Sequence, residues 1–325
     1  MKKGTATASY ALLQASLWGY YAIIVGYSSS FMYNHGFSDG QISIVLGITT
    51  ALSCALQLSL AELIARFEKL TVFKTLLVLG AALLVCAGLM RAPGAVPAVL
   101  GLGMGLVLLQ VLPAMGNAIG MDSIAQGSPV NYDVARAIGS GGYSVLALLT
   151  GQLVSKLGVD VLWVLTLADT LVFLGSVLWF HYAGEIAGKN QPQIREKRKG
   201  GFLRSYPLFG LVLLGSIVLM ISHNLVCSFL LQIIVHKGGD ASHQGIAAFI
   251  SAMTELPVMF AFGWLLKKRD SGFWLGFSAA VFVLKPLLLF LARNVYGVYA
   301  AQTTQMIGYA VYVMASAYYA GSATD

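Results

Sequence analysis

This sequence has few charged residues for its length. Only 10% of its 325 residues are charged, and 58% are hydrophobic, whereas a soluble domain carries about 25% charged residues. So few charges cannot cover a water-soluble protein of this length. The composition therefore excludes most soluble classes and indicates that lipid surrounds the chain.

Cysteine is also scarce, and no enzyme motif stands out. Cys54, Cys86 and Cys227 lie in apolar runs without metal-ligand spacing, so we expect small core hydrophobes rather than disulfides or ligands. The five histidines form no H-E-x-x-H pattern, and no glycine cluster follows a strand as a nucleotide-binding loop would. We expect no enzyme activity, no cofactor and no metal site.

Long apolar stretches dominate what is present. A membrane-spanning helix needs about 20 mostly apolar residues. Lys2 and Lys3 precede the first stretch, which lacks a clear cleavage site and is predicted to remain as a membrane helix. Ten stretches qualify: 9–33, 41–65, 72–91, 94–121, 136–156, 158–182, 206–235, 244–266, 272–292 and 295–320.

Basic residues set the expected orientation, because lysine and arginine concentrate in cytoplasmic loops. An N-terminus on the cytoplasmic side leaves only four basic residues outside: Arg91, Lys156, Lys237 and Arg293. The predicted location is the cytoplasmic (inner) membrane. This asymmetry accounts for the net charge of +7 without a nucleic-acid partner. The cytoplasmic set is Lys2, Lys3, Arg66, Lys69, Lys74, Lys189, Arg195, Lys197, Arg198, Lys199, Arg204, Lys267, Lys268 and Arg269.

A basic connection divides the chain into two bundles. We predict a six-helix bundle over 1–183, a cytoplasmic loop over 184–205, and a four-helix bundle over 206–325. The basic turn at 66–69 has a counterpart at 267–270, which suggests the repeated halves of a secondary transporter. A full second copy would need two further spans after Ala320. We expect an incomplete C-terminal bundle, with a ten-span protein as the alternative.

Two charges lie deep in the predicted spans. Glu255 is twelve residues before Lys267, and Lys285 is fifteen after Asp270, so they lie roughly 18 Å and 22 Å from the cytoplasmic side. Neighbouring helices could therefore pair them. Either they form a buried ion pair that fixes helix register, or they line a cavity. Pro257 and Pro286 follow them, and a proline tends to bend a helix.

Other polar residues in the spans have two interpretations each. Arg136 and Asp122 flank one cytoplasmic loop and could meet, or Arg136 could extend to the interface. Asp169 is either a proton site or a packing hydrogen bond. Amides and aromatic rings suit a sugar-like ligand, but amides also join helices. Those in the spans are Gln14, Trp18, Tyr21, Gln110, Asn224, Gln232, Gln302 and Gln305.

These features resemble the major facilitator superfamily, and its lactose-permease-like (oligosaccharide:proton symporter) branch in particular. The segment Asn131–Tyr143 is similar to the branch's Y-G-x-A-R-x-x-G-x-x-G/S-Y/W signature, and Glu255–Phe260 matches its eighth span. The resemblance implies substrate contacts from Arg136, with Asp122 as its carboxylate partner and Tyr143 as the stacking ring. It also implies that Glu255 links sugar and proton sites and that Lys285 assists proton release.

The sequence departs from that branch in its tenth span. Gln302, Gln305 and Gly308 stand where the lactose permease has its coupling Lys, His and Glu, which places proton coupling in question. In the turn after the second span, the superfamily's G-x-x-x-D-R pattern has lost its aspartate, and Ala65 precedes Arg66.

The expected fold is the major facilitator fold, with a solute cavity near the membrane midplane. The expected function is secondary transport of a small, sugar-like solute by a monomer. We assign substrate binding to Arg136, Asp122, Tyr143, Trp18, Gln232, Asn224 and Gln305, and proton coupling to Glu255, Lys285 and Asp169. The alternatives are export of amphipathic compounds and a membrane sensor or scaffold that does not transport.

Overall fold

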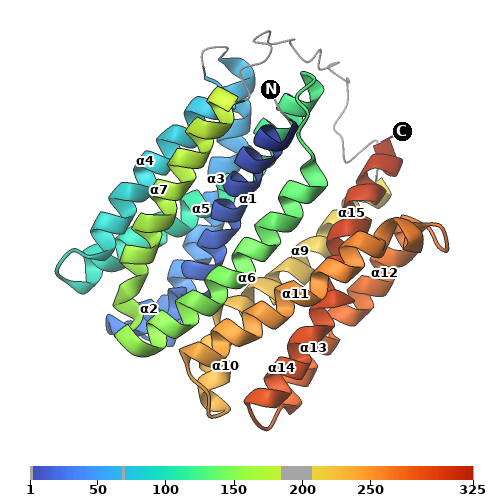
Figure 1. Ribbon diagram of the computed structural model, residues 1–325. Coiled ribbons are helices and arrows are strands. Elements are labelled where there is room, and N and C mark those ends of the chain that lie inside the picture. The colour runs from blue at the N-terminus through green and yellow to red at the C-terminus, as the bar shows by residue number, and fades with distance from the viewer. Residues whose placement is uncertain (1–2, 68–69, 184–206, 325) are drawn as a thin grey trace. The chain divides into compact units, whose positions relative to one another are not determined.

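The computed structural model describes residues 3–67, 70–183 and 207–324, and every regular element in these ranges is a helix (Figure 1). The prediction of an all-α protein is confirmed. The predicted cytoplasmic loop at 184–205 lies outside the described residues.

The first half contains long helices joined by short connections. In order they are α1 (Lys3–Ile23), η1 (Val25–Tyr27), α2 (Ser28–Asn34), α3 (Asp39–Arg66), α4 (Val72–Met90), α5 (Ala95–Ala125), α6 (Tyr132–Leu157), η2 (Val159–Val161) and α7 (Leu162–Ala183).

The second half contains more interrupted helices. They are α9 (Pro207–Ser228), α10 (Leu230–His236), α11 (Ala241–Leu266), α12 (Ser271–Phe282), α13 (Leu284–Leu291), α14 (Val295–Thr303), η3 (Thr304–Met306) and α15 (Tyr309–Thr324).

Within the described ranges, seven helical segments are long and apolar enough to cross a membrane, so the chain is a multi-pass membrane protein. They are 39–64, 72–90, 95–124, 134–157, 159–182, 210–228 and 271–291. The remaining three predicted spans are helical as well, but they are not among these seven. Helix α1 is one of them, and it carries the buried polar residues Ser9, Gln14 and Ser16. A helix that its neighbours shield from lipid does not need an apolar surface.

Side-chain caps explain where several helices begin. Asn131 accepts a hydrogen bond from the Val134 N–H at the start of α6, and Asp270 accepts one from the Phe273 N–H at the start of α12. Each cap satisfies one of the N–H groups that has no partner within the first helical turn.

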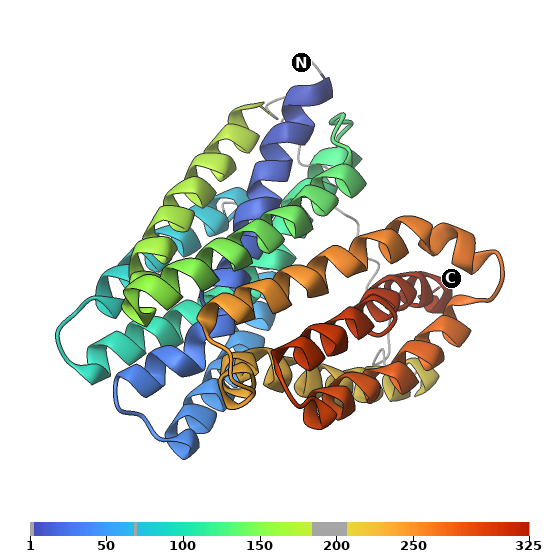
Figure 2. The same cartoon turned by 60° about the horizontal axis from the view of Figure 1, so that its bottom comes forward.

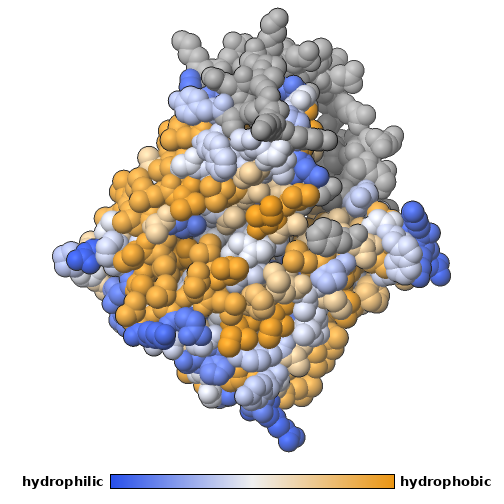
Figure 3. Space-filling view, viewed as in Figure 1, coloured by the Kyte–Doolittle hydropathy of each residue, from blue (hydrophilic) through white to orange (hydrophobic). Residues whose placement is uncertain are grey.

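Two compact units make up the chain. Unit 1 comprises Met1–Ala187 and Gly239–Phe249, and unit 2 comprises Gly188–Gly238 and Ile250–Asp325. In unit 1, α1 packs against α5, α6 and α7, and α4 packs against α5 and α7. Figures 1 and 2 both show α1 among these helices. Hydrophobic residues cover the outer face over α4 and α7, as lipid contact requires (Figure 3).

A short segment from the second half of the sequence belongs to unit 1, which the predicted boundary at 206 did not anticipate. The Tyr27 hydroxyl donates a 3.1 Å hydrogen bond to the Ala241 carbonyl. Gln152 donates through Nε2 to the Ser242 hydroxyl at 2.9 Å. Contact between the backbones is close enough that a Cβ atom on Gly151 would lie 2.6 Å from the Ala241 oxygen.

Asp240 lies in the connection before α11, outside the membrane spans. Its carboxylate is 2.6 Å from His243 Nδ1, and it accepts a 2.8 Å hydrogen bond from the Ser155 hydroxyl. The hydrogen bonds from His243 and Ser155 lower the pKa of Asp240 to about 2.

In unit 2, α11, α12 and α15 share an apolar core that includes Phe262, Leu275 and Tyr312. The predicted span 272–292 is interrupted at Val283, between α12 and α13. Pro286 lacks an N–H for the carbonyl four residues earlier, which explains this break. Pro257, in contrast, lies inside a continuous α11.

The cysteines only partly match the expected core positions. Cys86 is buried, but Cys54 is exposed and Cys227 is half-buried. All three thiols are free. Cys54 lies on α3, whose side chains are mostly exposed, so this cysteine is compatible with lipid contact rather than a core position.

Candidate functional site

Two polar clusters lie within the helices, one in each unit. We call the first the arginine cluster. It is formed in unit 1 by side chains from α1, α5 and α6, namely Tyr10, Gln14, Trp18, Asn117, Tyr132, Arg136 and Ser140. We call the second the lysine cluster. It is formed in unit 2 by His223, Cys227, Glu255, Lys285, Gln305 and Tyr309.

The arginine cluster is centred on a cation–aromatic contact. The guanidinium carbon of Arg136 lies 4.1 Å from the ring centroid of Trp18. Arg136 also donates from Nη1 to the Ser140 hydroxyl, one turn along α6, at 2.9 Å. Trp18 contacts Tyr21 at 5.3 Å between ring centroids. The arrangement fixes the plane of the guanidinium, which can donate two parallel hydrogen bonds to one partner.

An amide–hydroxyl network extends the arginine cluster along α1. Gln14 donates through Nε2 to the Tyr10 hydroxyl at 2.7 Å and to Asn117 Oδ1 at 3.2 Å. The Tyr132 hydroxyl donates to the same Asn117 oxygen at 3.2 Å. Gln14 Oε1 is buried and has no hydrogen-bond partner among the described residues. It could accept a hydrogen bond from a bound hydroxyl group or water.

Glycine makes the close approach of α1 and α6 possible. A Cβ atom on Gly139 would lie 3.1 Å from the Trp18 ring and 3.2 Å from Gln14 Cβ. Small residues such as glycine let two helices approach each other this closely. The same contact brings Trp18 and Arg136 together.

Asp122 and Tyr143 are the other unit 1 candidates for substrate binding. Asp122 is exposed near the end of α5, and across the described ranges it makes no ion pair. The predicted pairing of Asp122 with Arg136 is therefore not observed. Tyr143 is half-buried, seven residues after Arg136 on α6, so it lies two turns along the same helix face.

Asp169 on α7 is a buried carboxyl with 8% of its surface exposed. Its Oδ2 atom has no hydrogen-bond partner in the part of the chain that the structure describes. A Cβ atom on Gly19 would lie 3.0 Å and 3.1 Å from its two oxygens, so the α1 backbone passes directly over this carboxyl. The packing hydrogen bond that the sequence suggests for Asp169 is therefore not observed at Oδ2 among these residues.

In the lysine cluster, Lys285 donates from Nζ to Gln305 Oε1 at 2.5 Å. Glu255 and Cys227 both interact electrostatically with Lys285. The predicted pairing of the Glu255 and Lys285 side chains stays a prediction. Four helical segments, α9, α11, α13 and η3, contribute these groups.

Sequence reasoning missed three members of the lysine cluster. The His223 ring stacks on Tyr309 with centroids 4.5 Å apart and planes 14° apart. Cys227 Sγ lies 3.6 Å from His223 Nε2. The two residues are spaced i, i+4 on α9, which places them on one helix face. The sequence did contain a signal for this cluster. A histidine inside an apolar helix is rare, and a cysteine follows it at i+4 spacing.

The remaining unit 2 candidates lie on α9, α10 and α14. Asn224 is exposed, Gln232 is half-buried, and Gln302 is buried. No described residue accepts a hydrogen bond from Gln302 Nε2. Among the described residues, no group of three or more His, Cys, Asp or Glu side chains could hold a metal ion.

Comparison with known proteins does not assign the chain to a family. The sequence matches no known protein family, and no curated protein matches it. What is established is therefore a multi-pass all-α membrane protein with two internal polar clusters.

Proposed function

We propose that this chain is a secondary transporter of the major facilitator type, which moves a small hydrophilic solute across the membrane by alternating access. The observation that carries the proposal is the arginine cluster. It places a guanidinium, an indole ring and two amides inside a bundle of apolar helices. Ionisable groups in that environment are costly, and they usually mark a solute or ion pathway.

The proposed binding chemistry follows from the donors and rings in this cluster. Arg136 donates hydrogen bonds to hydroxyl or other acceptor oxygens of the solute, and the buried Gln14 Oε1 accepts one. Trp18 and Tyr143 offer ring faces for an apolar sugar face. This combination suits a polyhydroxylated solute, which is both a donor and an acceptor and has one less polar side.

Within the same proposal, the lysine cluster couples transport to a second ion, with Glu255 as the proton carrier. Lys285 supports this role because its ammonium acts on the Glu255 carboxylate. His223 interacts electrostatically with Lys285, whereas the tenth predicted span has no histidine. His223 thus supplies an imidazole to this cluster from a different helix, α9.

A ligand screen by thermal stability tests the binding proposal. A ligand that binds only the folded protein raises its melting temperature. We would screen the detergent-purified chain against sugars, nucleosides, carboxylates and lipophilic cations. We expect a neutral sugar to give a shift that Arg136→Ala removes. A shift with lipophilic cations alone would replace the proposal with an exporter, and binding without flux in proteoliposomes would favour a sensor.

Two carboxylate variants test the coupling proposal. We expect Glu255→Gln to abolish accumulation against a gradient while preserving exchange of the solute identified in the screen. Asp169→Asn is the corresponding variant for the proton-coupling candidate of unit 1. It keeps the shape and hydrogen-bonding capacity of the side chain but cannot carry a proton. Accumulation retained in Glu255→Gln would exclude Glu255 as the carrier.

A further inference from the structure

The turn between α11 and α12 carries three consecutive exposed cations, Lys267, Lys268 and Arg269. Within the described ranges, no ion pair joins them to a carboxylate. The adjacent Asp270 is occupied as the cap of α12, where its Oδ1 accepts a 2.7 Å hydrogen bond from the Phe273 N–H. The positive charge of this turn is therefore available to an external anion.

The backbone of the turn is well fixed. The N–H groups of Lys267 and Lys268 donate to the Trp264 and Leu265 carbonyls at 3.2 Å and 3.0 Å. Arg269 donates its N–H to the Leu265 oxygen at 3.3 Å, and Trp274 Nε1 donates to that oxygen at 3.0 Å. All three cations thus extend from a base held by the last turn of α11. A fixed base reduces the entropy that ligand binding would cost.

Aromatic rings lie under two of the cations. Lys268 Nζ is 3.7 Å from the ring centroid of Trp264, and the Arg269 guanidinium is 5.4 Å from that of Phe273. Trp264 is 57% exposed and Phe273 is 48% exposed, although both belong to apolar helices. Tryptophan gathers at the boundary between lipid tails and headgroups. The cations of this turn therefore suit the headgroup layer of a membrane, and the rings suit the boundary between headgroups and lipid tails.

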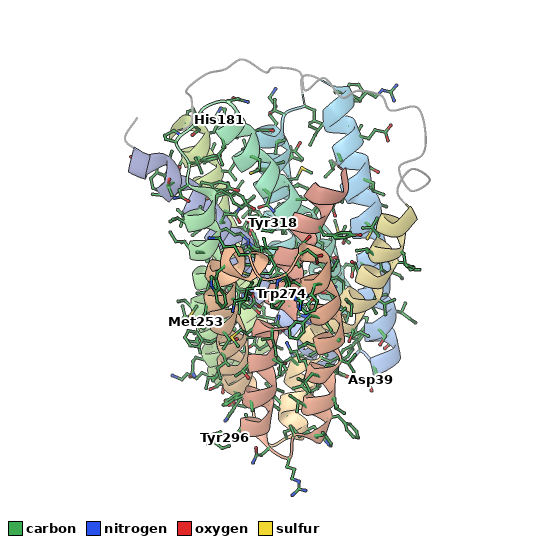
Figure 4. The ribbon with its side chains drawn as sticks, turned by 90° about the vertical axis from the view of Figure 1, so that its right-hand side faces the viewer. Asp39, His181, Met253, Trp274, Tyr296 and Tyr318 are labelled. Carbon is green, nitrogen blue, oxygen red and sulfur yellow. The ribbon has the colours of Figure 1, made fainter. Side chains whose placement is uncertain are left out.

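The molecular surface agrees with this layering. In Figure 3, the end of unit 2 that carries the α11–α12 turn is hydrophilic and borders hydrophobic surface. Figure 4 places Trp274 toward this end and Tyr296 at the opposite end of the unit. The turn itself is hydrophilic at its tip and aromatic at its base.

We propose that the α11–α12 turn binds the headgroup of an anionic phospholipid. Arg269 and Lys267 contact the phosphate oxygens, for which a guanidinium offers a bidentate fork. Lys268 adds charge while Trp264 and Phe273 contact the upper acyl chains. The occupant is a lipid rather than a soluble anion, because the rings beneath the cations would leave a soluble ion facing apolar surface. The inference is independent of any transport activity.

The test uses the full chain, purified and stripped of lipid in a neutral detergent. Phosphatidylglycerol or phosphatidylcholine is added, and the melting temperature and the bound lipid are measured, the latter by native mass spectrometry. We expect phosphatidylglycerol to bind more tightly and to raise the melting temperature more. Each cation replaced by glutamine should weaken binding roughly fivefold, and the triple variant should bind both lipids equally.

Matched variants separate this site from general charge and from misfolding. Lys237→Gln with Arg293→Gln removes two cations from connections at the other end of unit 2 and should preserve the lipid preference. Trp264→Leu keeps every charge and should weaken binding of both lipids. Three results would overturn the proposal: an unchanged preference in the triple variant, an equal loss in the Lys237 and Arg293 variant, or an equal thermal shift with inorganic phosphate.

Discussion

Lys285 and Gln305 are joined by a 2.5 Å hydrogen bond from the ammonium to the amide oxygen, across 20 residues of sequence. The bond connects α13 to η3, so it ties together two of the interrupted segments of unit 2. An ammonium inside a membrane bundle needs an acceptor of this kind, because lipid offers none.

Removing that acceptor should destabilise unit 2. We expect Gln305→Leu to cost about 1–3 kcal/mol, because it leaves the Lys285 ammonium without one hydrogen-bond partner. Gln305→Glu keeps an acceptor oxygen and should retain most of the stability. Thermal unfolding in detergent measures both. Equal melting temperatures for the leucine variant and the wild type would mean that water or Glu255 replaces the amide.

The contact between Arg136 and Trp18 should appear as a coupling energy. A double-mutant cycle with Arg136→Gln and Trp18→Leu isolates this pair from their other contacts. We expect a coupling of about 0.5–2 kcal/mol, as for a partly desolvated cation–π pair. Additive effects of the two substitutions would contradict the contact. Trp18→Phe retains a ring and should preserve part of the coupling.

Helix α5 should tolerate no side chain at Gly101. A Cβ atom there would lie 2.7 Å from the Met90 N and 2.8 Å from the Cys86 carbonyl, both backbone atoms of α4. We expect Gly101→Ala to destabilise unit 1 by about 1–3 kcal/mol through overpacking. Gly88→Ala is the matched control on α4, since a Cβ atom at Gly88 meets nothing within 4 Å. Similar melting temperatures for the two variants would exclude the close crossing.

The hydrogen bonds of Asp240 should make stability depend on acid pH. The pKa of Asp240 is lowered to about 2, against about 3.9 in an unfolded chain. The stabilisation is therefore complete above about pH 5 and is lost as the pH falls toward 2.

Asp240→Asn tests this pH dependence. The difference in melting temperature between the wild type and the variant should stay constant above about pH 5 and shrink below about pH 4. The carboxylate is half-exposed, so we expect at most about 1 kcal/mol. Ser155→Ala removes one donor to Asp240 and should give a smaller effect over the same range. A difference that grows on acidification would contradict the assignment.

Two serines test the expected orientation of the chain. Ser38 precedes α3 and Ser128 follows α5, so the predicted orientation places Ser38 outside and Ser128 inside. In a variant that lacks the three native cysteines, an impermeant thiol reagent should label Ser38→Cys in intact cells. Ser128→Cys should react only after the membrane is opened. The reverse pattern would place the N-terminus outside.

The sequence was sufficient to predict where the long helices lie, but not their interruptions, and only part of the polar clusters. Apolar runs predict α3 and α5 because each needs only length and hydrophobicity. The Arg136–Trp18 contact depends on the rotation of α6 against α1, which Gly139 determines and hydropathy does not describe. The sequence could not predict the direction of the Asp122 side chain. That direction depends on the residue at which α5 ends, and hydropathy does not locate this residue.

Unit 2 shows the same limit more clearly. The sequence predicts that Glu255 and Lys285 lie at depths within about one helical turn of each other, and each acts electrostatically on the other. Tyr309 begins α15 after an interruption that starts at Thr304, and only that interruption brings its ring to His223. The apolar run predicts a continuous helix over 295–320. In such a helix, the Tyr309 side chain would not point toward His223.

The break between α12 and α13 has a consequence for mutagenesis. Pro286 has no N–H, so the carbonyl of Phe282, four residues earlier, lacks its usual helical donor. Phe282 lies three residues before Lys285. The Phe282 carbonyl is therefore a backbone acceptor that does not depend on any polar side chain. Alanine scanning cannot delete it. Solute or water binding that survives truncation of every polar side chain in the lysine cluster would point to this oxygen, and replacing Pro286 with an N–H-bearing residue would remove it.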